Sequence, residues 1–190
     1  MAQREPALWI VRHGETEWSR AGRHTGRTDV PLTAAGVEQA TALRERIGAR
    51  PFALVLSSPL RRAWDTCRLA GLSEAARTTD DLLEWDYGAY EGRTTTEIQR
   101  EVPGWSIWTG DVPGGEAIEE VGARARRLIE EALTARGDVA LFGHCHVLRI
   151  LAACWLGLPP REGRLFALTT ASMGVLGYEN AVHVIRAWNV

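Results

Sequence analysis

The sequence lacks lysine entirely, so all 22 of its basic residues are arginine. This absence excludes mechanisms that need a lysine amine, such as a Schiff base or a phosphate-binding P-loop. The formal net charge of -2 is also far from the strongly basic balance of a nucleic-acid-binding domain. We therefore expect no nucleic-acid partner, and the chemistry should rest on arginine, histidine and carboxylate groups.

Cysteines are few and long apolar runs are missing. Cys67, Cys145 and Cys154 are odd in number, show no CxxC spacing and lie in apolar helical patterns, so we expect small buried side chains. No apolar run approaches the ~18 residues of a membrane span, and the N-terminus lacks the apolar stretch of a signal peptide. The sequence therefore predicts a soluble cytoplasmic protein with no membrane partner.

The hydrophobic pattern predicts one α/β domain over residues 1–190. A composition of 45% hydrophobic and 24% charged residues is that of a globular chain. Because strand-like and helix-like stretches alternate, we expect a single three-layer domain with a mostly parallel central sheet and helices on both faces. The predicted strands cover 7–11, 52–56, part of 72–92, 139–142, 165–168, 173–178 and 182–188, and the predicted helices cover 33–47, 59–71, 94–101, 116–136 and 145–156. The helix at 33–47 is expected to be capped by Thr33 and to have one apolar stripe, formed by Val37, Ala40, Leu43 and Ile47.

Two of the predicted strands end in a similar way. The first runs into Arg12-His13, and the strand over 139–142 runs into Gly143-His144. In open α/β sheets, ligands bind beyond the carboxyl ends of the strands. If the two strands are neighbours, the two histidines face each other at the mouth of the sheet, where core packing does not require histidine.

Two histidines and nearby arginines around one crevice suit a phosphate monoester. The helix predicted at 59–71 carries Arg61 and Arg62 at its start, which brings cations to the same rim. A guanidinium matches phosphate oxygens in a bidentate fork, and a neutral imidazole can attack phosphorus. The second histidine, expected to be the more protonated one, would stabilise the phosphoryl oxygens in the transition state. Glu84, on a loop, is placed to protonate the departing alkoxide.

Four sequence blocks follow one another along the chain. They are Arg12-His13-Gly14-Glu15-Thr16 with Thr25-Gly26, Ser57-Ser58-Pro59-Leu60-Arg61-Arg62-Ala63 with Thr66, Glu84 to Gly92, and Gly143-His144. In this order they resemble the histidine phosphatase superfamily, which is phosphoglycerate-mutase-like. Details around Glu84 and His144 are similar to a narrower group of short acid phosphatases and sedoheptulose bisphosphatase-like enzymes that act on sugar phosphates.

The resemblance implies the catalytic roles. His13 would be the nucleophile that forms a phosphohistidine. Arg12, Arg61 and His144 would hold the phosphoryl oxygens. Glu84 would protonate the leaving oxygen and then deprotonate the water that hydrolyses the intermediate. The resemblance implies no metal and no dissociable cofactor.

The resemblance also assigns the surroundings of the site. Thr25 and Gly26 would add loop contacts to the phosphate. Tyr87 would line the substrate side, and Ser19 stands where many members have an asparagine that contacts the substrate. Arg62 is expected to be a solvated neighbour outside the site.

Two further histidines are expected to have no catalytic role. His24 lies in a polar loop and is expected at the loop surface, with a contact to the substrate at the rim as the alternative. His144-Cys145-His146 invites a metal site, but no cluster of acidic residues accompanies it, so a metal is not expected. The resemblance implies instead that His146 lies beside the pocket, because similar members also carry a histidine there. The role of the segment with Trp105 and Trp108 stays open.

The spacing of the blocks favours hydrolysis. Only 22 residues separate Arg61 from Glu84, and a short, open site admits water. We expect a metal-independent phosphomonoester hydrolase acting on a small phosphorylated metabolite, with a sugar phosphate favoured. The alternatives are a cofactor-dependent phosphoglycerate mutase and, from another class, a non-catalytic phosphate-binding module. Strand edges of such domains often pair, so a homodimer is also kept as an expectation.

Overall fold

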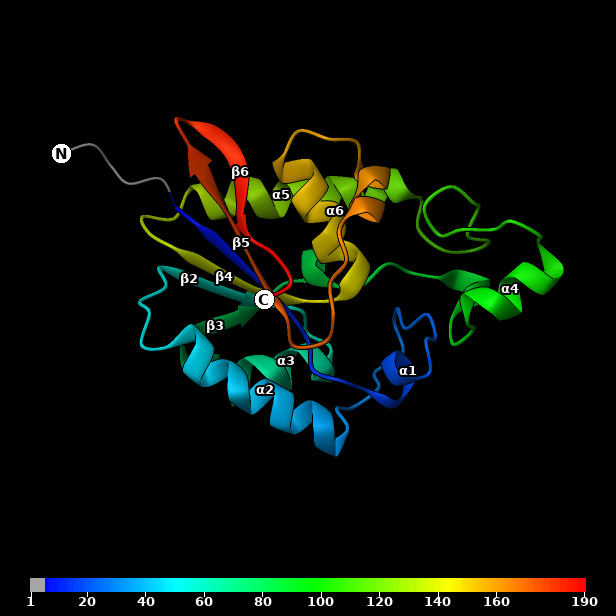
Figure 1. Ribbon diagram of the computed structural model, residues 1–190, viewed down its shortest axis with the longest axis horizontal. Helices are drawn as coiled ribbons and strands as arrows, with labels where there is room; N and C mark the ends of the chain where they lie inside the picture. The colour runs from blue at the N-terminus through cyan, green and yellow to red at the C-terminus, as the bar shows by residue number, and fades with distance from the viewer. Residues whose placement is uncertain (1–5) are drawn as a thin grey trace.

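The computed structural model describes residues 6–190 and contains a six-stranded sheet (Figure 1). The strand order is β3-β2-β4-β1-β5-β6, and only β5 runs against the other five. This is the mostly parallel sheet that the sequence predicted. The strands are β1 (Leu8–Arg12), β2 (Leu54–Ser57), β3 (Ala76–Thr78), β4 (Val139–Gly143), β5 (Met173–Glu179) and β6 (Val182–Ala187).

Helices cover both faces of the sheet and complete the three layers. Figure 1 shows α2 and α3 on one side and α5 and α6 on the other. The α2 helix begins as the sequence predicted, because the Thr33 hydroxyl accepts from the Gly36 N–H at 3.0 Å. The helices are α1 (Glu17–Arg20), α2 (Ala34–Ile47), α3 (Arg61–Leu69), α4 (Thr95–Glu101), α5 (Ile118–Leu133) and α6 (Cys145–Trp155), with short 3-10 turns at Ser73–Ala75, Asp80–Leu82, Gly88–Tyr90 and Pro160–Leu165.

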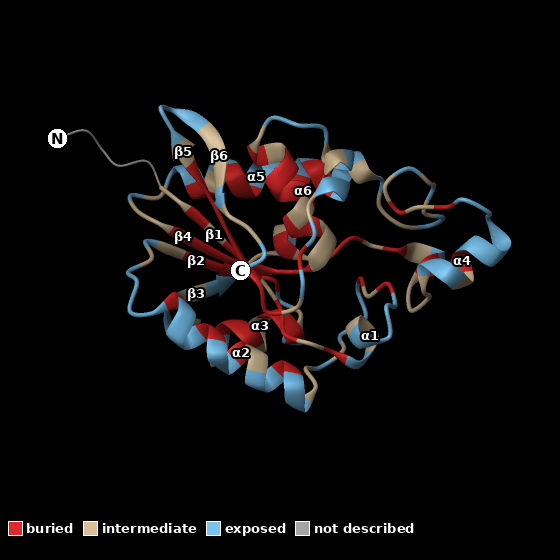
Figure 2. Ribbon diagram, in the orientation of Figure 1, coloured by how far each residue is buried: buried red, intermediate tan, exposed pale blue. Residues whose placement is uncertain are grey.

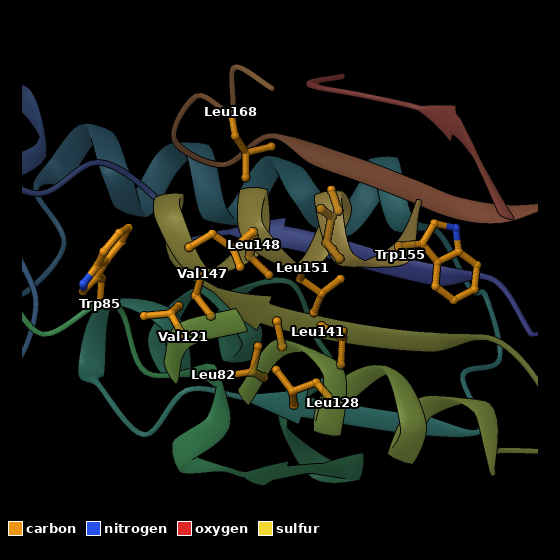
Figure 3. Close-up of a cluster of buried hydrophobic side chains, with 14 of the residues drawn as sticks. Leu82, Trp85, Val121, Leu128, Leu141, Val147, Leu148, Leu151, Trp155 and Leu168 are labelled. Atoms are coloured by element: carbon orange, nitrogen blue, oxygen red, sulfur yellow. The ribbon is translucent and has the colours of Figure 1, made fainter. Parts of the chain in front are cut away.

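The continuous apolar strands are explained by burial on both sides. Successive side chains of a strand point to opposite faces, so Leu141 packs with α5 and α6 while Phe142 packs with α2 and α3. Figure 3 shows the first of these clusters, where Leu128 and Leu151 lie around Leu141. Figure 2 shows burial concentrated on the strands and on the inner faces of the helices.

Two local predictions are wrong. Residues 165–168 form no strand: Leu165 ends a 3-10 turn and is 62% exposed. A short apolar run has no periodicity that separates a strand from a surface segment with a few anchored side chains. Val37, expected on the buried stripe of α2, is 41% exposed, and Gly36 is buried in its place.

A lobe between β3 and α5 lies outside the three layers. It contains α4 and extends to the right in Figure 1, on the side where α1 also lies. A β-bridge between Arg23 and Thr94 joins the loop after α1 to this lobe. The chain after β1 can pass close to α2 because Gly14 has no side chain. A Cβ at this position would lie only 2.4 Å from the Gly36 carbonyl oxygen. These connections place the loop after α1 and the lobe at the carboxyl ends of the strands.

Candidate active site

The two histidines at the strand ends lie side by side. β1 and β4 pair in parallel with Arg12 opposite Gly143, so the next residues, His13 and His144, leave the sheet together. Their ring centroids are 5.2 Å apart, and both side chains are buried. The structure thus brings together the two imidazoles that the strand pattern singled out.

His13 is held in the tautomer that leaves Nε2 free. Its Nδ1 lies 2.7 Å from the Gly14 carbonyl oxygen, which can only accept, so Nδ1 carries the proton. Burial lowers the pKa of His13 well below its usual range, and the positive charges of Arg62 and Arg12 lower it further. The ring is therefore neutral at physiological pH, with the Nε2 lone pair available, which is the state that a nucleophilic imidazole needs.

His144 is neutral in the opposite tautomer. Arg62 Nε donates to His144 Nδ1 at 3.0 Å, and because a guanidinium only donates, this nitrogen must accept. The proton lies on Nε2, which donates to Ser58 Oγ at 2.8 Å. Burial lowers the pKa of His144 well below its usual range, helped by Arg62 and His13. The expectation of a more protonated second histidine is therefore wrong: His144 offers a fixed N–H donor and no full charge.

The two consecutive arginines occupy opposite environments. Arg62 is fully buried, and its Nη groups donate to the carbonyls of Thr25, Gly26 and Thr28 at 2.9 to 3.0 Å. Arg61 is exposed, and its guanidinium makes no hydrogen bond to any residue from 6 to 190. The environments are the reverse of those expected: Arg62 is buried and donates to His144, and Arg61 is exposed and lies outside the cavity wall. Consecutive helical residues differ by about 100° in direction, so only one of the two can face inward.

Arg12 keeps one N–H group for a ligand. Its Nη1 donates to the Leu168 carbonyl at 2.5 Å. Its Nε is buried and has no hydrogen-bond partner within residues 6–190. A buried donor without a partner is costly and uncommon in proteins. Arg12 and His13 line the same cavity, and an anionic oxygen that reached this N–H would satisfy it.

Glu84 is a buried carboxylate at the N-terminus of α6. It accepts from the backbone N–H groups of Trp85, His146 and Val147, each at 3.0 Å, and is 3% exposed. Burial by itself raises the pKa of Glu84, but the hydrogen bonds and the charge of His146, with a contribution from His144, together outweigh burial and hold the pKa well below its usual range. The carboxyl group is thus ionised in the free protein, with its charge stabilised by the helix end.

Three of these groups open onto a cavity of about 310 Å³, and they are the predicted site residues Arg12, His13 and Glu84. His144 and Arg62 are fully buried and are not among the residues that line it. The rest of the wall combines hydroxyl groups with aromatic and imidazole rings. The hydroxyls belong to Ser19, Thr25, Thr95 and Ser106, and the rings belong to His24, Tyr87, Trp108 and His146.

Two predicted contact residues line the cavity with their hydroxyl groups already engaged. The Thr25 hydroxyl donates to the Arg23 carbonyl at 3.0 Å. The Ser19 hydroxyl donates to the Thr16 carbonyl at 3.0 Å and accepts from the Thr16 N–H, so it caps α1. Both side chains shape the wall, and a direct substrate contact would require them to exchange partners.

Gly26 is not among the residues that line the cavity, so its predicted contact with phosphate gains no support from the cavity wall. Its N–H donates to the carboxylate of Glu91 at 2.9 to 3.0 Å. A Cβ at this position would lie 2.5 Å from the Trp85 carbonyl oxygen. Glycine is required here because two backbone segments pass very close to each other.

The structure gives the rings around the leaving-group side a larger role than the sequence predicted. His24, expected at the loop surface, is 8% exposed, and burial together with the charge of His146 lowers its pKa to about 4. Trp108 lines the cavity, whereas Trp105 packs inside the lobe against Tyr90. The only sequence signal for His24 was its position directly before the Thr25-Gly26 block.

A family model matches almost the whole chain. The model is that of the histidine phosphatase superfamily (branch 1), and it covers residues 8–190. The chain belongs to the histidine phosphatase superfamily. The resemblance carried by the four sequence blocks is therefore confirmed.

Several histidine phosphatase relatives are similar over most of their length. An acid phosphatase of Mycobacterium tuberculosis is 42% identical, with 96% of this chain and 91% of the relative covered. The sedoheptulose 1,7-bisphosphatase of Saccharomyces cerevisiae is 35% identical over 80% of this chain and 68% of its own length. The solved structure of a mycobacterial glucosyl-3-phosphoglycerate phosphatase, 30% identical, superposes with a TM-score of 0.87 over 97% of this chain and 99% of its own. Other relatives are named probable phosphoglycerate mutases.

This histidine phosphatase is thus an enzyme of a family that acts on phosphorylated substrates. Among residues 6–190, no group of three histidine, cysteine or acidic side chains is arranged to hold a metal ion. None of the helices in the same part of the chain is both long enough and apolar enough to cross a bilayer.

Proposed function

We propose that this enzyme hydrolyses phosphomonoesters of small metabolites through a phosphohistidine on His13, without a metal ion. One observation carries the proposal: a neutral His13 with a free Nε2 lines the same cavity as Arg12, whose buried Nε has no partner among residues 6–190. The first group is a nucleophile, and the second is a vacant donor for an anionic oxygen. Glu84 in the same cavity can carry a proton between the enzyme and the reacting oxygens.

The reaction then has two balanced steps. His13 Nε2 attacks phosphorus, the bond from phosphorus to the ester oxygen breaks, and that oxygen takes a proton from the Glu84 carboxyl. The product alcohol leaves neutral. Water next attacks the phosphohistidine, Glu84 takes a proton from the water, and the phosphorus–nitrogen bond breaks. Phosphate is released and His13 returns to its neutral state.

The phosphoryl oxygens would be held by donors that are fixed before the substrate binds. Arg12 Nε is one donor, and the Nε2–H of His144 becomes another when it exchanges Ser58 for a phosphate oxygen. Arg62, in place of the expected Arg61, is the buried cation behind them. It sets the tautomer of His144, and its charge adds to the effect of burial, which keeps His13 neutral.

The proton on Glu84 has to arrive with the substrate. The carboxyl group is ionised in the free protein, and a phosphate monoester has a second pKa of about 6, so its monoanion can supply one proton. Transfer of this proton to Glu84 relieves the repulsion between the carboxylate and the phosphoryl oxygens. We expect kcat/KM to fall as the pH rises above about 6, because the substrate then arrives as the dianion.

A sugar phosphate is the substrate class that best suits the leaving-group side. The hydroxyls of Thr95 and Ser106 can hydrogen-bond to a polyol, and the ring of Trp108 can pack against its C–H faces. Two of the similar proteins are named for phosphorylated sugar compounds. A cofactor-dependent phosphoglycerate mutase is the second candidate, because other relatives carry that name.

We also propose a cytoplasmic location and a homodimer. The location is supported by three cysteines that are all free. The homodimer is supported by the edge strand β6, where the apolar Val182 is 62% exposed.

The decisive experiment is phosphate release by the purified enzyme in the presence of a metal chelator. The panel contains sugar monophosphates, sugar bisphosphates and phosphoglycerates, and an acid-labile phosphoenzyme is trapped in parallel. We expect rapid release from at least one sugar phosphate and a label on His13. Interconversion of phosphoglycerates without release would favour the mutase, and bound phosphate without any turnover would favour a binding module.

His13→Ala provides the matched variant. Loss of the nucleophile should reduce turnover by at least about 10⁴-fold and remove the phosphoenzyme. The fold should persist, because the hydrogen bond of the side chain runs only to the neighbouring Gly14. An active and folded His13→Ala protein would rule out the proposed mechanism.

A further inference from the structure

The glycine after His13 carries the oxygen that orients the His13 ring. His13 Nδ1 lies 2.7 Å from the Gly14 carbonyl oxygen, and a carbonyl can only accept, so this contact keeps the proton on Nδ1 and leaves Nε2 free. Glycine has more backbone freedom than any other residue, so the direction of this carbonyl depends on what holds the chain around Gly14.

The peptide group that contains this carbonyl is held from α2. It joins Gly14 to Glu15, and its N–H donates to Gln39 Oε1 at 2.9 Å. A trans peptide group is planar, so fixing its N–H also fixes the direction of its carbonyl. Among residues 6–190, Gln39 and the His13 ring are the only hydrogen-bond partners of this peptide group.

The preceding peptide group, between His13 and Gly14, is held from α3. Its N–H donates to Thr66 Oγ1 at 3.0 Å, and the Thr66 hydroxyl donates in turn to the Arg62 carbonyl at 2.6 Å. Both directions are settled, because a backbone N–H can only donate and a carbonyl can only accept. Thr66 is fully buried. The oxygen of the same peptide group accepts from the Ala171 N–H at 3.0 Å.

Neither of these two side chains can reach the substrate. Gln39 and Thr66 are not among the residues that line the cavity, and they come from α2 and α3, which lie side by side on one face of the sheet (Figure 1). Any effect that they have on the reaction must therefore pass through the backbone at Gly14.

We propose that Gln39 and Thr66 are positioning residues for the nucleophile: they hold the two peptide groups around Gly14 and so direct its carbonyl at His13 Nδ1. The inference rests on the function proposed above, in which His13 Nε2 attacks phosphorus. Without this acceptor in place, the proton of the neutral ring can move to Nε2, where it removes the attacking lone pair. The ring can also turn away from the direction of attack.

Gln39→Met and Thr66→Val test the two supports separately, because each removes the acceptor with little change in size. We expect the rate of phosphohistidine formation in single turnovers at saturating substrate to fall by about 10- to 100-fold. The loss should be larger in Gln39→Met, since the peptide group between Gly14 and Glu15 then keeps only the His13 ring as a partner. Inhibition by inorganic phosphate should stay at the wild-type level, because neither side chain lines the cavity.

Two further variants separate positioning from packing. Thr66→Ser keeps the hydroxyl, so it should recover most of the rate that Thr66→Val loses. Thr41→Val is the matched control: on α2, the exposed Thr41 hydroxyl donates to the carbonyl four residues earlier at 2.8 Å, as Thr66 does on α3, but it has no bond to residues 13–15. Its rate should equal that of the wild type. A loss that persists in Thr66→Ser, or wild-type rates in both Gln39→Met and Thr66→Val, would overturn the inference.

Nitrogen NMR of the histidines tests the same point without turnover. In the wild type we expect His13 Nδ1 to carry the proton and Nε2 to be unprotonated. In Gln39→Met and Thr66→Val, the His13 Nε2 signal should move toward that of a protonated nitrogen, and an unchanged His13 spectrum in both variants would overturn the inference. Failure of the proposed function gives a different result: the wild type would form no phosphohistidine, while the spectra would still decide whether the two residues hold the His13 ring.

Discussion

The two ends of the cavity are built from different kinds of structure. At the phosphate end, His13 and His144 follow two paired parallel strands, and a carbonyl and a buried guanidinium fix their rings. At the leaving-group end, His24 and Trp108 come from the loop after α1 and from the lobe around α4. The sheet therefore sets the phosphoryl chemistry, while loops set the shape offered to the alcohol. Loops tolerate sequence change more readily than strands, so substrate preference can vary without loss of the reaction.

Glu84 connects the two ends. Its backbone belongs to the loop that leads into the lobe, but its carboxylate is held by the N-terminus of α6 next to His144. A substitution of this carboxyl group should therefore lower the reaction rate most for leaving groups that must be protonated.

Glu84→Gln should give the largest effect among the following variants. We expect the rate with sugar phosphates to fall by about 10²–10⁴-fold, the range typical of a lost general acid. The loss with p-nitrophenyl phosphate should be much smaller, because that leaving group departs unprotonated. Steady-state kinetics with both substrates provide the measurement. Equal losses would mean that Glu84 acts only through the structure.

The matched pair Arg62→Met and Arg61→Met tests which arginine belongs to the phosphate end. Arg62→Met leaves three loop carbonyls and His144 Nδ1 without a donor, so we expect about a 10- to 100-fold loss of kcat/KM and about 2–4 kcal/mol lower free energy of unfolding. Arg61→Met should change stability by less than about 0.5 kcal/mol. Steady-state kinetics and urea unfolding of both variants provide the measurement. A larger loss of kcat/KM in Arg61→Met than in Arg62→Met would restore the assignment expected from the sequence.

Trp108→Ala tests the leaving-group end by itself. The ring is held against the cavity by the Arg149 guanidinium, 4.5 Å from the ring centroid. Removing it should raise KM for the sugar phosphate by about 3- to 10-fold, equivalent to roughly 1 kcal/mol of aromatic contact. Inhibition by inorganic phosphate should stay at the wild-type level, because phosphate occupies only the other end. Weaker inhibition by phosphate would show that the two ends are not separable.

Stability should fall in mild acid because His13, His24 and His144 are buried as neutral rings. Their pKa values are lowered in the folded protein, to about 4 for His24, so the unfolded chain binds more protons below about pH 6.5. Each histidine then removes up to about 1.4 kcal/mol of unfolding free energy per pH unit as the pH falls through this window. Glu84 adds a loss of the same sign at lower pH, below its ordinary value of 4.5.

Urea unfolding at a series of pH values measures this slope. His24→Gln should give a shallower slope than the wild type between pH 6.5 and about 4, because one of the three buried imidazoles is gone. An identical slope in the two proteins would show that His24 takes up a proton equally in the folded and unfolded chains.

Much of the fold could be predicted from the sequence because burial on both faces leaves a simple pattern. The runs that became β1, β2 and β4 are apolar at every position and stop where polar residues begin. The failure at 165–168 has the same physical origin, since a short apolar run looks alike in a strand and in a surface segment. In this segment the Phe166 ring packs against the Trp188 ring, with the ring centroids 5.4 Å apart, so the side chain is held without strand pairing.

The candidate site could be predicted only where it depends on the order of residues along one element. Arg12, His13 and His144 follow from strands that stop at the same edge. The choice between Arg61 and Arg62 depends on how α3 is rotated about its axis, which packing against the sheet sets. The burial of His24 depends on the lobe. Thr95 of the lobe is 71 residues away along the chain, yet its Oγ1 lies 3.2 Å from His24 Nε2.

The sequence by itself determined the order of strands and helices, the family and the residues that can carry phosphoryl transfer, because each of these is written in local patterns. Only the tertiary structure decided which arginine is buried, which tautomer each histidine holds and that Glu84 is ionised before substrate binds. Protonation depends on desolvation and on donors that approach from distant segments, and no local pattern contains that information.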